Sequence, residues 1–179
     1  MLEARYLPAY TVEDYKRWKG DWELIDGIPF AMTPSPLGKH QKLTAKISHF
    51  ILSELEKNCP ESEISVYVEL DWIVNDITVL RPDISVTCKD VEEFIKEPPE
   101  VVFEVVSKST VLKDEGLKFG IYEREKVKYY ILVYPDIKKA RGFELKNSKY
   151  EKFFDSDTGT LELNICKNCN VKLEIQKLF

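Results

Sequence analysis

The sequence VVFEVVSKST, residues 101–110, is the most informative part of this chain. Val101 to Val106 form an almost continuous β-branched and aromatic run, which is typical of a central strand covered on both faces. Glu104 interrupts this run, although a carboxylate in a buried strand is costly unless it is paired or binds a cation. Ser107 to Thr110 then supply capping residues for a helix that we expect to continue to about Lys126.

A second acid in an apolar setting is Asp83, which follows Arg81 and Pro82. Residues 65–74 and 78–87 are each predicted as one strand of a hairpin that carries Asp83 near its end. The two acids therefore lie on neighbouring core elements. Because Mg²⁺ needs only one or two protein carboxylates and keeps several waters, we interpret Asp83 and Glu104 as half of a divalent-metal site. The backbone carbonyl of Val105 could supply a further oxygen.

The remaining pattern predicts an α+β fold in which strands outnumber helices. Thr11 and Asp14 have the spacing of a capping box and begin a short helix through Trp18. Asp26-Gly27 is a two-residue hairpin signal between two short strands. After a loop at 33–36, a long amphipathic helix is predicted from Leu37 to about Lys57. The other predicted strands are 129–134, 140–145, 150–154, 160–164 and 171–175.

Length and composition indicate one domain covering residues 1–179. The chain has 44% apolar and 12% aromatic residues, enough for one substantial core. Its formal net charge of -5 argues against a generally basic nucleic-acid-binding surface, so any DNA would have to be attracted by a local cleft. No apolar run approaches the roughly 20 residues needed to span a bilayer. We therefore expect a cytoplasmic protein that does not associate with membranes.

The four cysteines give a weak signal. Cys166 and Cys169 have the spacing of metal ligands, but zinc would need two more, and the chain has only two histidines. We interpret residues 166–169 as a turn between two C-terminal strands and keep zinc or redox chemistry as a minor alternative. Cys59 and Cys88 are interpreted as ordinary thiols.

The helix after Glu104 carries side chains that suit a phosphodiester-cleaving site. Asp114, Lys118 and Tyr122 follow at intervals of four, so they share one helix face. Lys118 could then face the carboxylates and donate to water or phosphate. The alternatives are an exposed Asp114–Lys118 pair worth about 0.3–0.5 kcal/mol and a structural ion pair of Glu104 with an arginine or lysine such as Arg81.

Taken together, these motifs resemble the Uma-type restriction endonucleases, a family of the PD-(D/E)XK nuclease superfamily. The resemblance extends from Trp22 onward and implies a restriction-endonuclease-like mixed sheet flanked by helices, with additional antiparallel strands at the N- and C-terminal ends. It rests on these segments: residues 81–83, 104–110 and 127–130, Asp114, Lys118, Tyr122, residues 23–27 and His40.

The resemblance implies that Asp83 and Glu104 bind Mg²⁺ or Mn²⁺, with DNA as the substrate. The superfamily normally has a lysine two residues after the second acid, where this chain has Val106. In this family the following helix supplies the lysine, which makes Lys118 the third catalytic candidate. An acid that the family often has in the next strand is replaced here by Tyr129.

Several residues are expected to support this site. Glu23 alternates with apolar neighbours and would simply be an exposed edge acid, but the family match makes it a candidate site carboxylate. His40 lies on the apolar helix stripe and is either a core histidine or a member of the site, while Tyr122 would support the metal ligands. Ser107 is expected to cap the helix and to donate near phosphate. Lys108 and Lys113, near the helix N-terminus in a locally basic segment, are the expected phosphate contacts.

The interpretation is a metal-dependent DNA endonuclease that acts as a homodimer, since cutting both strands needs two sites. The competing hypothesis is a catalytically inactive binding or assembly module that keeps the nuclease fold. Val106 and the acidic net charge favour that alternative. A third, weaker hypothesis is hydrolysis of RNA or another phosphate ester by the same residues.

Overall fold

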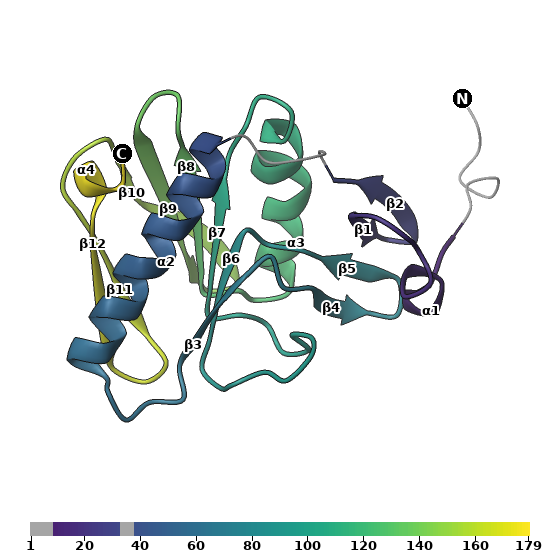
Figure 1. The fold of residues 1–179 in the computed structure, drawn as a ribbon, viewed down its shortest axis with the longest axis horizontal. Helices are drawn as coiled ribbons and strands as arrows, with labels where there is room; N and C mark the ends of the chain where they lie inside the picture. Colours follow the sequence, from purple (N-terminus) through teal and green to yellow (C-terminus); the bar gives the residue numbers. More distant parts are fainter. Residues whose placement is uncertain (1–8, 33–37) are drawn as a thin grey trace.

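A computed structural model describes residues 9–32 and 38–179 and has three sheets (Figure 1). The largest has six strands in the order β10-β9-β8-β7-β6-β3, the second has four in the order β2-β1-β5-β4, and β11 pairs with β12. The strands are β1 (Trp22–Ile25), β2 (Ile28–Ala31), β3 (Ser65–Val68), β4 (Trp72–Asn75), β5 (Thr78–Leu80), β6 (Ile84–Thr87), β7 (Val101–Val105), β8 (Tyr129–Tyr134), β9 (Lys139–Lys146), β10 (Lys149–Ser156), β11 (Thr160–Ile165) and β12 (Cys169–Glu174). The helices are α1 (Val12–Tyr15), α2 (Gly38–Asn58), the π-helix η2 (Lys113–Lys118), α3 (Phe119–Arg124) and α4 (Ile175–Leu178).

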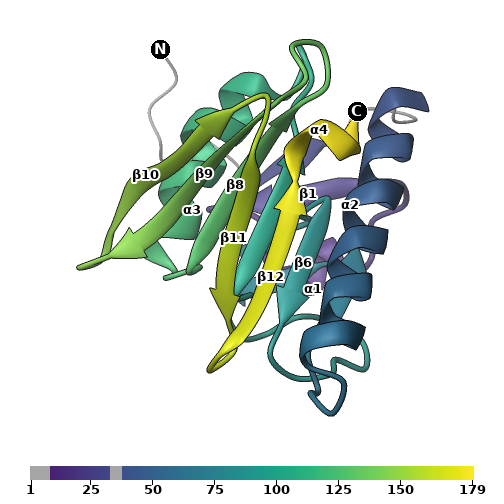
Figure 2. The same ribbon diagram turned by 90° about the vertical axis from the view of Figure 1, so that its left-hand side faces the viewer.

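The large sheet contains both parallel and antiparallel strand pairs, which confirms the predicted mixed sheet. β7 and β8 run parallel, while the other paired strands run antiparallel. The connection from β7 to β8 passes through η2 and α3 on one face of the sheet. On the other face, α2 lies next to the β11–β12 hairpin (Figure 2).

Strand alternation divides the core between these two faces. Val101, Phe103 and Val105 of β7 pack in a cluster with the apolar stripe of α2 and the β11–β12 hairpin. Val102 packs instead with Tyr122 and other side chains on the α3 face. Because successive side chains of a strand alternate, Glu104 also faces α3. The arrangement thus directs one acid of a fully buried strand toward the helix that carries Lys118.

Two predicted long strands are each broken in the structure, so that part of the prediction was wrong. Residues 65–74 form β3 and β4, and residues 78–87 form β5 and β6. The segments do pair as a hairpin, but β4 and β5 join the small sheet while β3 and β6 join the large one. Pro82 has no N–H to donate, and Glu69 has a positive φ of 52°, so the regular ladder is interrupted at both points. Asp83 therefore lies in the junction between the sheets.

The helix predictions were partly right. The capping box of Thr11 and Asp14 is present, but α1 ends at Tyr15 instead of Trp18. The helix expected from Ser107 to Lys126 consists of a turn, a π-helical segment and a short α-helix. The predicted loop at 33–36 lies outside the described residues. Among those that are described, no helix combines the length and the apolarity needed to cross a membrane.

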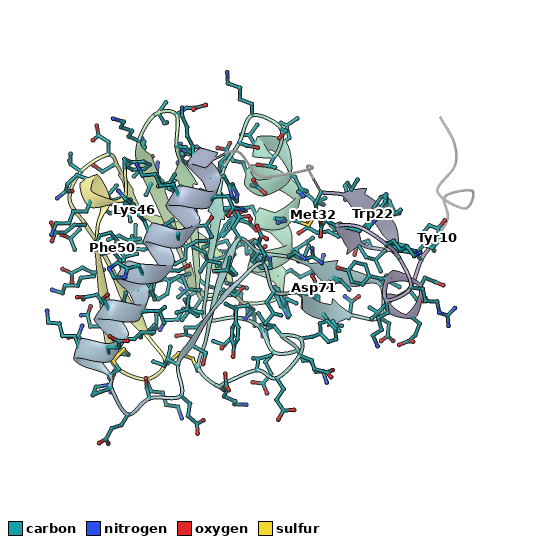
Figure 3. The ribbon with its side chains drawn as sticks, viewed as in Figure 1. Tyr10, Trp22, Met32, Lys46, Phe50 and Asp71 are labelled. Carbon is teal, nitrogen blue, oxygen red and sulfur yellow. A yellow bond between two sulfur atoms is a disulfide. The ribbon has the colours of Figure 1, made fainter. Side chains whose placement is uncertain are left out.

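The cysteines form two disulfides, so the interpretation of Cys59 and Cys88 as ordinary thiols was wrong (Figure 3). Cys59, just after α2, is bonded to Cys169, and Cys88, just after β6, is bonded to Cys166. Residues 166–168 do form the predicted turn between β11 and β12. Both disulfides thus fix this one turn to distant parts of the chain.

Candidate active site

Glu104 is buried on β7, and its carboxylate contacts two donors, one from η2 and one from α3. Its Oε1 lies 2.8 Å from Lys118 Nζ and accepts a hydrogen bond of 2.7 Å from the Tyr122 hydroxyl. The expected common face of Lys118 and Tyr122 is therefore present. The alternative that Glu104 is a buried acid paired with an arginine or lysine agrees with its contact with Lys118. Only the example of Arg81 was wrong, because that guanidinium binds the carboxylates of Asp71 and Asp21.

Glu23 lies on the opposite side of the same lysine. Its Oε1 is 2.9 Å from Lys118 Nζ, and its Oε2 is 2.6 Å from Lys113 Nζ. The backbone N–H of Arg81 donates to Oε1 as well. The simple interpretation of Glu23 as an exposed edge acid was wrong, since its exposed fraction is 0%.

Asp83, at the junction of the sheets, contacts both β7 and α2 through its carboxylate. Its Oδ2 accepts a 2.6 Å hydrogen bond from the backbone N–H of Val105 and lies 3.1 Å from His40 Nε2, in the first turn of α2. His40 is half-buried against this carboxylate. The hydrogen bond that His40 donates to Asp83 raises the pKa of His40 above its ordinary value, while burial opposes the shift and the Asp83 charge adds to it.

Asp114 is a further buried acid of this region, with an exposed fraction of 2%. The alternative of a solvent-exposed Asp114–Lys118 pair was therefore wrong. Burial raises the pKa of Asp114, whereas the Lys118 charge and a hydrogen bond from Thr110 lower it. Asp114 and Lys118 are the buried residues of η2.

The site has more acids than bases. The pKa of Glu104 is raised well above its ordinary value, first by burial and then by the charges of Asp83, Asp114 and Glu23, against the opposing effect of Lys118. Burial would also raise the pKa of Glu23, but Lys118 and Lys113 lower it. Lys118 keeps its proton, because nearby carboxylates raise its pKa although burial favours the neutral form. Glu23 and Glu104 thus share the ammonium group of Lys118, and Glu23 also binds Lys113. Asp83 faces His40 instead.

This donor set fits a hard divalent cation. The contacts of the two predicted ligands each use one oxygen, Oδ2 of Asp83 and Oε1 of Glu104. Oδ1 of Asp83 and Oε2 of Glu104 are the atoms that could bind the ion, and oxygen ligands are those that Mg²⁺ prefers. Val105 contacts Asp83 through its N–H, and the role predicted for its carbonyl stays a prediction.

The remaining predicted residues lie around this cluster. Ser107 and Thr110 exchange hydrogen bonds between their hydroxyls and backbone N–H groups, so Ser107 does cap the turn that leads into the helix. Lys108 is exposed in this turn. Lys113, the other expected phosphate contact, is instead bound to Glu23 in this structure.

The sequence did not point to the network that holds the junction carrying Asp83. Arg81 Nε lies 2.7 Å from Asp71 Oδ1, and the Tyr15 hydroxyl donates to Asp71 Oδ2 over 2.7 Å. Asp71 is labelled in Figure 3 between the small sheet and the rest of the molecule. These residues are far apart in the chain, so only the folded structure connects them. They position the Arg81 backbone, which in turn contacts Glu23.

Comparisons with known proteins give the family and the fold. The family model "Uma2: Putative restriction endonuclease" matches residues 12–170. A crystal structure from Anabaena variabilis ATCC 29413, described as a putative nuclease belonging to DUF820, is similar with a TM-score of 0.75. That likeness covers 94% of this chain and 97% of the other at 18% sequence identity, so it is evidence for the fold. No curated protein matches the chain.

Proposed function

The chain belongs to the Uma2 family, whose model carries the description "Putative restriction endonuclease", and from that membership we propose that it is a metal-dependent DNA endonuclease. It hydrolyses phosphodiester bonds at the cluster formed by Asp83, Glu104 and Lys118. The observation that carries this proposal is the gathering of three almost fully buried acids, Glu23, Glu104 and Asp114, around the buried ammonium group of Lys118. An unpaired buried charge is costly, and a bound divalent cation offsets that cost.

The metal is proposed to be Mg²⁺ or Mn²⁺, held by the carboxylates of Asp83 and Glu104. Such an ion, when bound, activates a water molecule and neutralises charge on phosphate. His40 and the Val105 N–H orient Asp83, and Tyr122 orients Glu104. The predicted ligands would thus be fixed by packed neighbours before the ion arrives.

Lys118 is proposed to act as a donor and not as a base. Its raised pKa keeps the ammonium group protonated, since several carboxylates surround it. Two carboxylates engage Nζ, Glu23 at 2.9 Å and Glu104 at 2.8 Å. An ammonium group has three N–H donors, so one remains for the attacking water or for a phosphate oxygen.

The proposed substrate is DNA, and the proposed assembly is a homodimer that places one site on each strand. Lys108 is an exposed basic residue of the turn that leads into the helical segment of the site, and it is proposed to contact phosphate. Lys113 is proposed to act indirectly, by holding the Glu23 carboxylate to which it is bound.

The test is cleavage of plasmid DNA with Mg²⁺ or Mn²⁺ by the wild type, Asp83→Asn and Glu104→Gln. Glu162→Gln, an exposed acid of β11 that pairs with Lys172 at the surface, is the matched control. We expect each site variant to lose at least about a hundredfold in rate, as removal of one charge-stabilising group typically does, and the control to keep its rate. Cleavage that survives both site substitutions would exclude this site. DNA binding without cleavage or metal binding would support the inactive module, and cleavage of RNA alone would change the substrate.

A further inference from the structure

A second cluster of metal-binding groups lies away from the candidate active site. The Sγ atoms of Cys88 and Cys166 and a carboxylate oxygen of Glu100 all lie within 4.8 Å of one another. Cys88 follows β6, Cys166 lies in the β11–β12 turn, and Glu100 directly precedes β7. Three separate segments therefore bring two sulfurs and one carboxylate to one point.

The carboxylate of this cluster is oriented by two donors. The backbone N–H of Cys166 donates to Glu100 Oε1 over 3.0 Å, and Lys128 Nζ lies 3.1 Å from the same oxygen. Both contacts use Oε1, which leaves Oε2 as the oxygen able to bind a cation. Supporting hydrogen bonds of this kind orient the ligands of protein metal sites.

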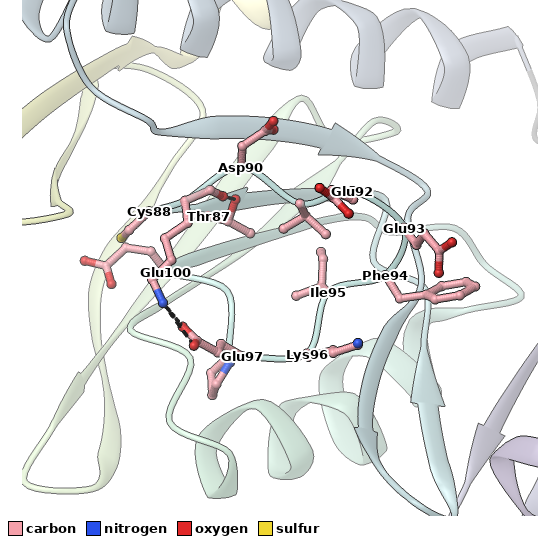
Figure 4. Close-up of a pocket in the computed structure, with 13 residues that line it drawn as sticks. Thr87, Cys88, Asp90, Glu92, Glu93, Phe94, Ile95, Lys96, Glu97 and Glu100 are labelled. Atoms are coloured by element: carbon pink, nitrogen blue, oxygen red, sulfur yellow. Dashed lines mark hydrogen bonds and ion pairs between the residues drawn. The ribbon is translucent and has the colours of Figure 1, made fainter.

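The cluster opens onto a cavity of about 550 Å³ formed by the segment from Thr87 to Glu100 (Figure 4). Cys88 and Glu100 stand together at one end of this cavity. Its lining has two lysines, one of them, Lys89, bound to Glu97 at 3.0 Å. It has five acids: Asp90, Glu92, Glu93, Glu97 and Glu100. Of these acids, Glu100 is the one that stands beside Cys88 (Figure 4).

We propose that reduction of the Cys88–Cys166 disulfide creates a site for a soft divalent cation such as zinc, bound by both thiolates and Glu100. Zinc prefers tetrahedral sites with sulfur, nitrogen and carboxylate ligands, and water from the cavity completes the fourth position. The disulfide and the metal are then alternative ways of joining the β11–β12 turn to the loop after β6. The site is separate from the proposed endonuclease function and does not depend on it.

The chemistry of this exchange is balanced. Reduction adds two electrons and two protons to the disulfide, so the S–S bond breaks and two thiols form. A dithiol protein is a suitable reductant, since its own thiols become a disulfide. Zinc then binds as both thiols release their protons to solvent and two Zn–S bonds form.

The local geometry permits this change. Two Zn–S bonds of about 2.3 Å at a tetrahedral angle separate the sulfurs by about 3.8 Å. Cys88 is exposed, which gives a reductant access to the disulfide. Cys166 lies in a turn and not in a strand ladder, so both side chains can rotate without breaking a sheet. In reducing compartments such thiols are kept reduced, and a bound metal would maintain the connection there.

The test uses cobalt(II), whose thiolate complexes absorb in the near ultraviolet, under anaerobic conditions. A trialkylphosphine reduces the disulfides and becomes a phosphine oxide, with its oxygen taken from water. The double variant Cys59→Ser/Cys169→Ser keeps the proposed site, and Cys88→Ser/Cys166→Ser removes it. We expect the absorption only in the first, and only after reduction.

Glu100→Gln in the first background should weaken cobalt binding at least about tenfold in Kd, the range seen when metal-site contacts are removed. Glu97→Gln, in the same cavity but bound to Lys89, should leave Kd unchanged. Equal cobalt absorption in both double variants would overturn the proposal. So would its absence from the first variant while circular dichroism shows a folded chain.

A measurement on the reduced wild type covers the case in which a double variant does not fold. Zinc should protect Cys88 and Cys166 from alkylation, while Cys59 still reacts, as read by mass spectrometry. Protection of Cys166 together with Cys169 would instead indicate binding by the turn alone and would overturn the proposal.

Discussion

The carboxylate of Glu23 on β1 lies 2.9 Å from Lys118 Nζ, and both side chains are almost completely buried. The two residues are far apart in the chain, and β1 does not belong to the six-stranded sheet. The small sheet therefore contributes directly to the charge balance of the candidate active site. The candidate site is therefore built from both sheets and from the helical segment that carries Lys118.

Lys118→Met should strongly destabilise the metal-free protein, because it leaves buried carboxylates without their shared cation. The expected loss in the free energy of unfolding is about 3–5 kcal/mol, measured by urea denaturation. Lys39→Met removes an exposed pair with Asp136 and should cost less than about 1 kcal/mol. Similar losses in the two variants would contradict a central role for Lys118 in the charge balance.

Tyr122→Phe should remove one hydrogen bond to a charged acceptor without changing the packing of the ring. The expected loss in unfolding free energy is about 1.5–3 kcal/mol. Tyr150→Phe is the matched control, since its hydroxyl donates over 2.8 Å to the neutral carbonyl of Val127 and should contribute about 1 kcal/mol. If Tyr150→Phe lowers the unfolding free energy as much as Tyr122→Phe or more, the Tyr122 hydroxyl does not donate to a charged acceptor.

The His40–Asp83 contact should make stability depend on pH in metal-free buffer. The hydrogen bond to Asp83 raises the pKa of His40 above 6.5 in the folded state. The contribution of this contact to the free energy of unfolding is therefore complete below about pH 6.5 and is lost as the pH rises through the raised pKa of His40. His40→Gln keeps an amide donor without the charge.

The difference in unfolding free energy between the wild type and His40→Gln should thus be larger at about pH 5.5 than at about pH 8.5. His49→Gln, on the same helix, controls for the general loss of an imidazole. A difference that grows toward high pH would have the wrong sign for this ion pair.

Lys108→Ala should weaken DNA binding through the loss of one phosphate contact. The slope of log K against log salt concentration should decrease in magnitude by about 0.9, the value for one contact with duplex DNA. Binding is measured by titration with Ca²⁺ in place of Mg²⁺. Lys177→Ala removes an exposed lysine on α4 and should leave the slope unchanged. An unchanged slope for Lys108→Ala would show that Lys108 does not contact a DNA phosphate.

Gly27→Ala should destabilise the β1–β2 hairpin that carries Glu23. Gly27 has a φ of +78°, and an added Cβ would lie 3.2 Å from Ala9 Cα. The left-handed conformation costs a residue with a Cβ about 1–2 kcal/mol. Gly120→Ala in α3 meets nothing within 4 Å and should stabilise by up to about 1 kcal/mol. Two thermal denaturation curves shifted in the same direction would refute this assignment.

Local patterns predicted the parts of the site that lie close together in the chain. The apolar run around Glu104 indicated a buried strand, and the four-residue spacing placed Lys118 and Tyr122 on one face. These signals suffice because strand alternation and helix periodicity are local properties. Glu104, Lys118 and Tyr122 meet as that spacing predicted.

Long-range contacts explain what the sequence did not predict. The burial of Glu23 depends on β1 pairing with β5, and the pairing of Lys113 depends on the position of Glu23. The strand breaks near Glu69 and Pro82 follow from a hairpin shared between two sheets. The disulfides join residues separated by 110 and 78 positions, which spacing alone cannot reveal.

The two disulfides also determine what happens when the backbone is cut. Cys59 and Cys88 precede the segment 89–99, and Cys166 and Cys169 follow it. A protease that cleaves within this segment therefore leaves two fragments joined twice, and the chain still migrates as one covalent molecule until it is reduced. A cut in the segment that borders the acidic cavity is therefore visible by gel electrophoresis only after reduction.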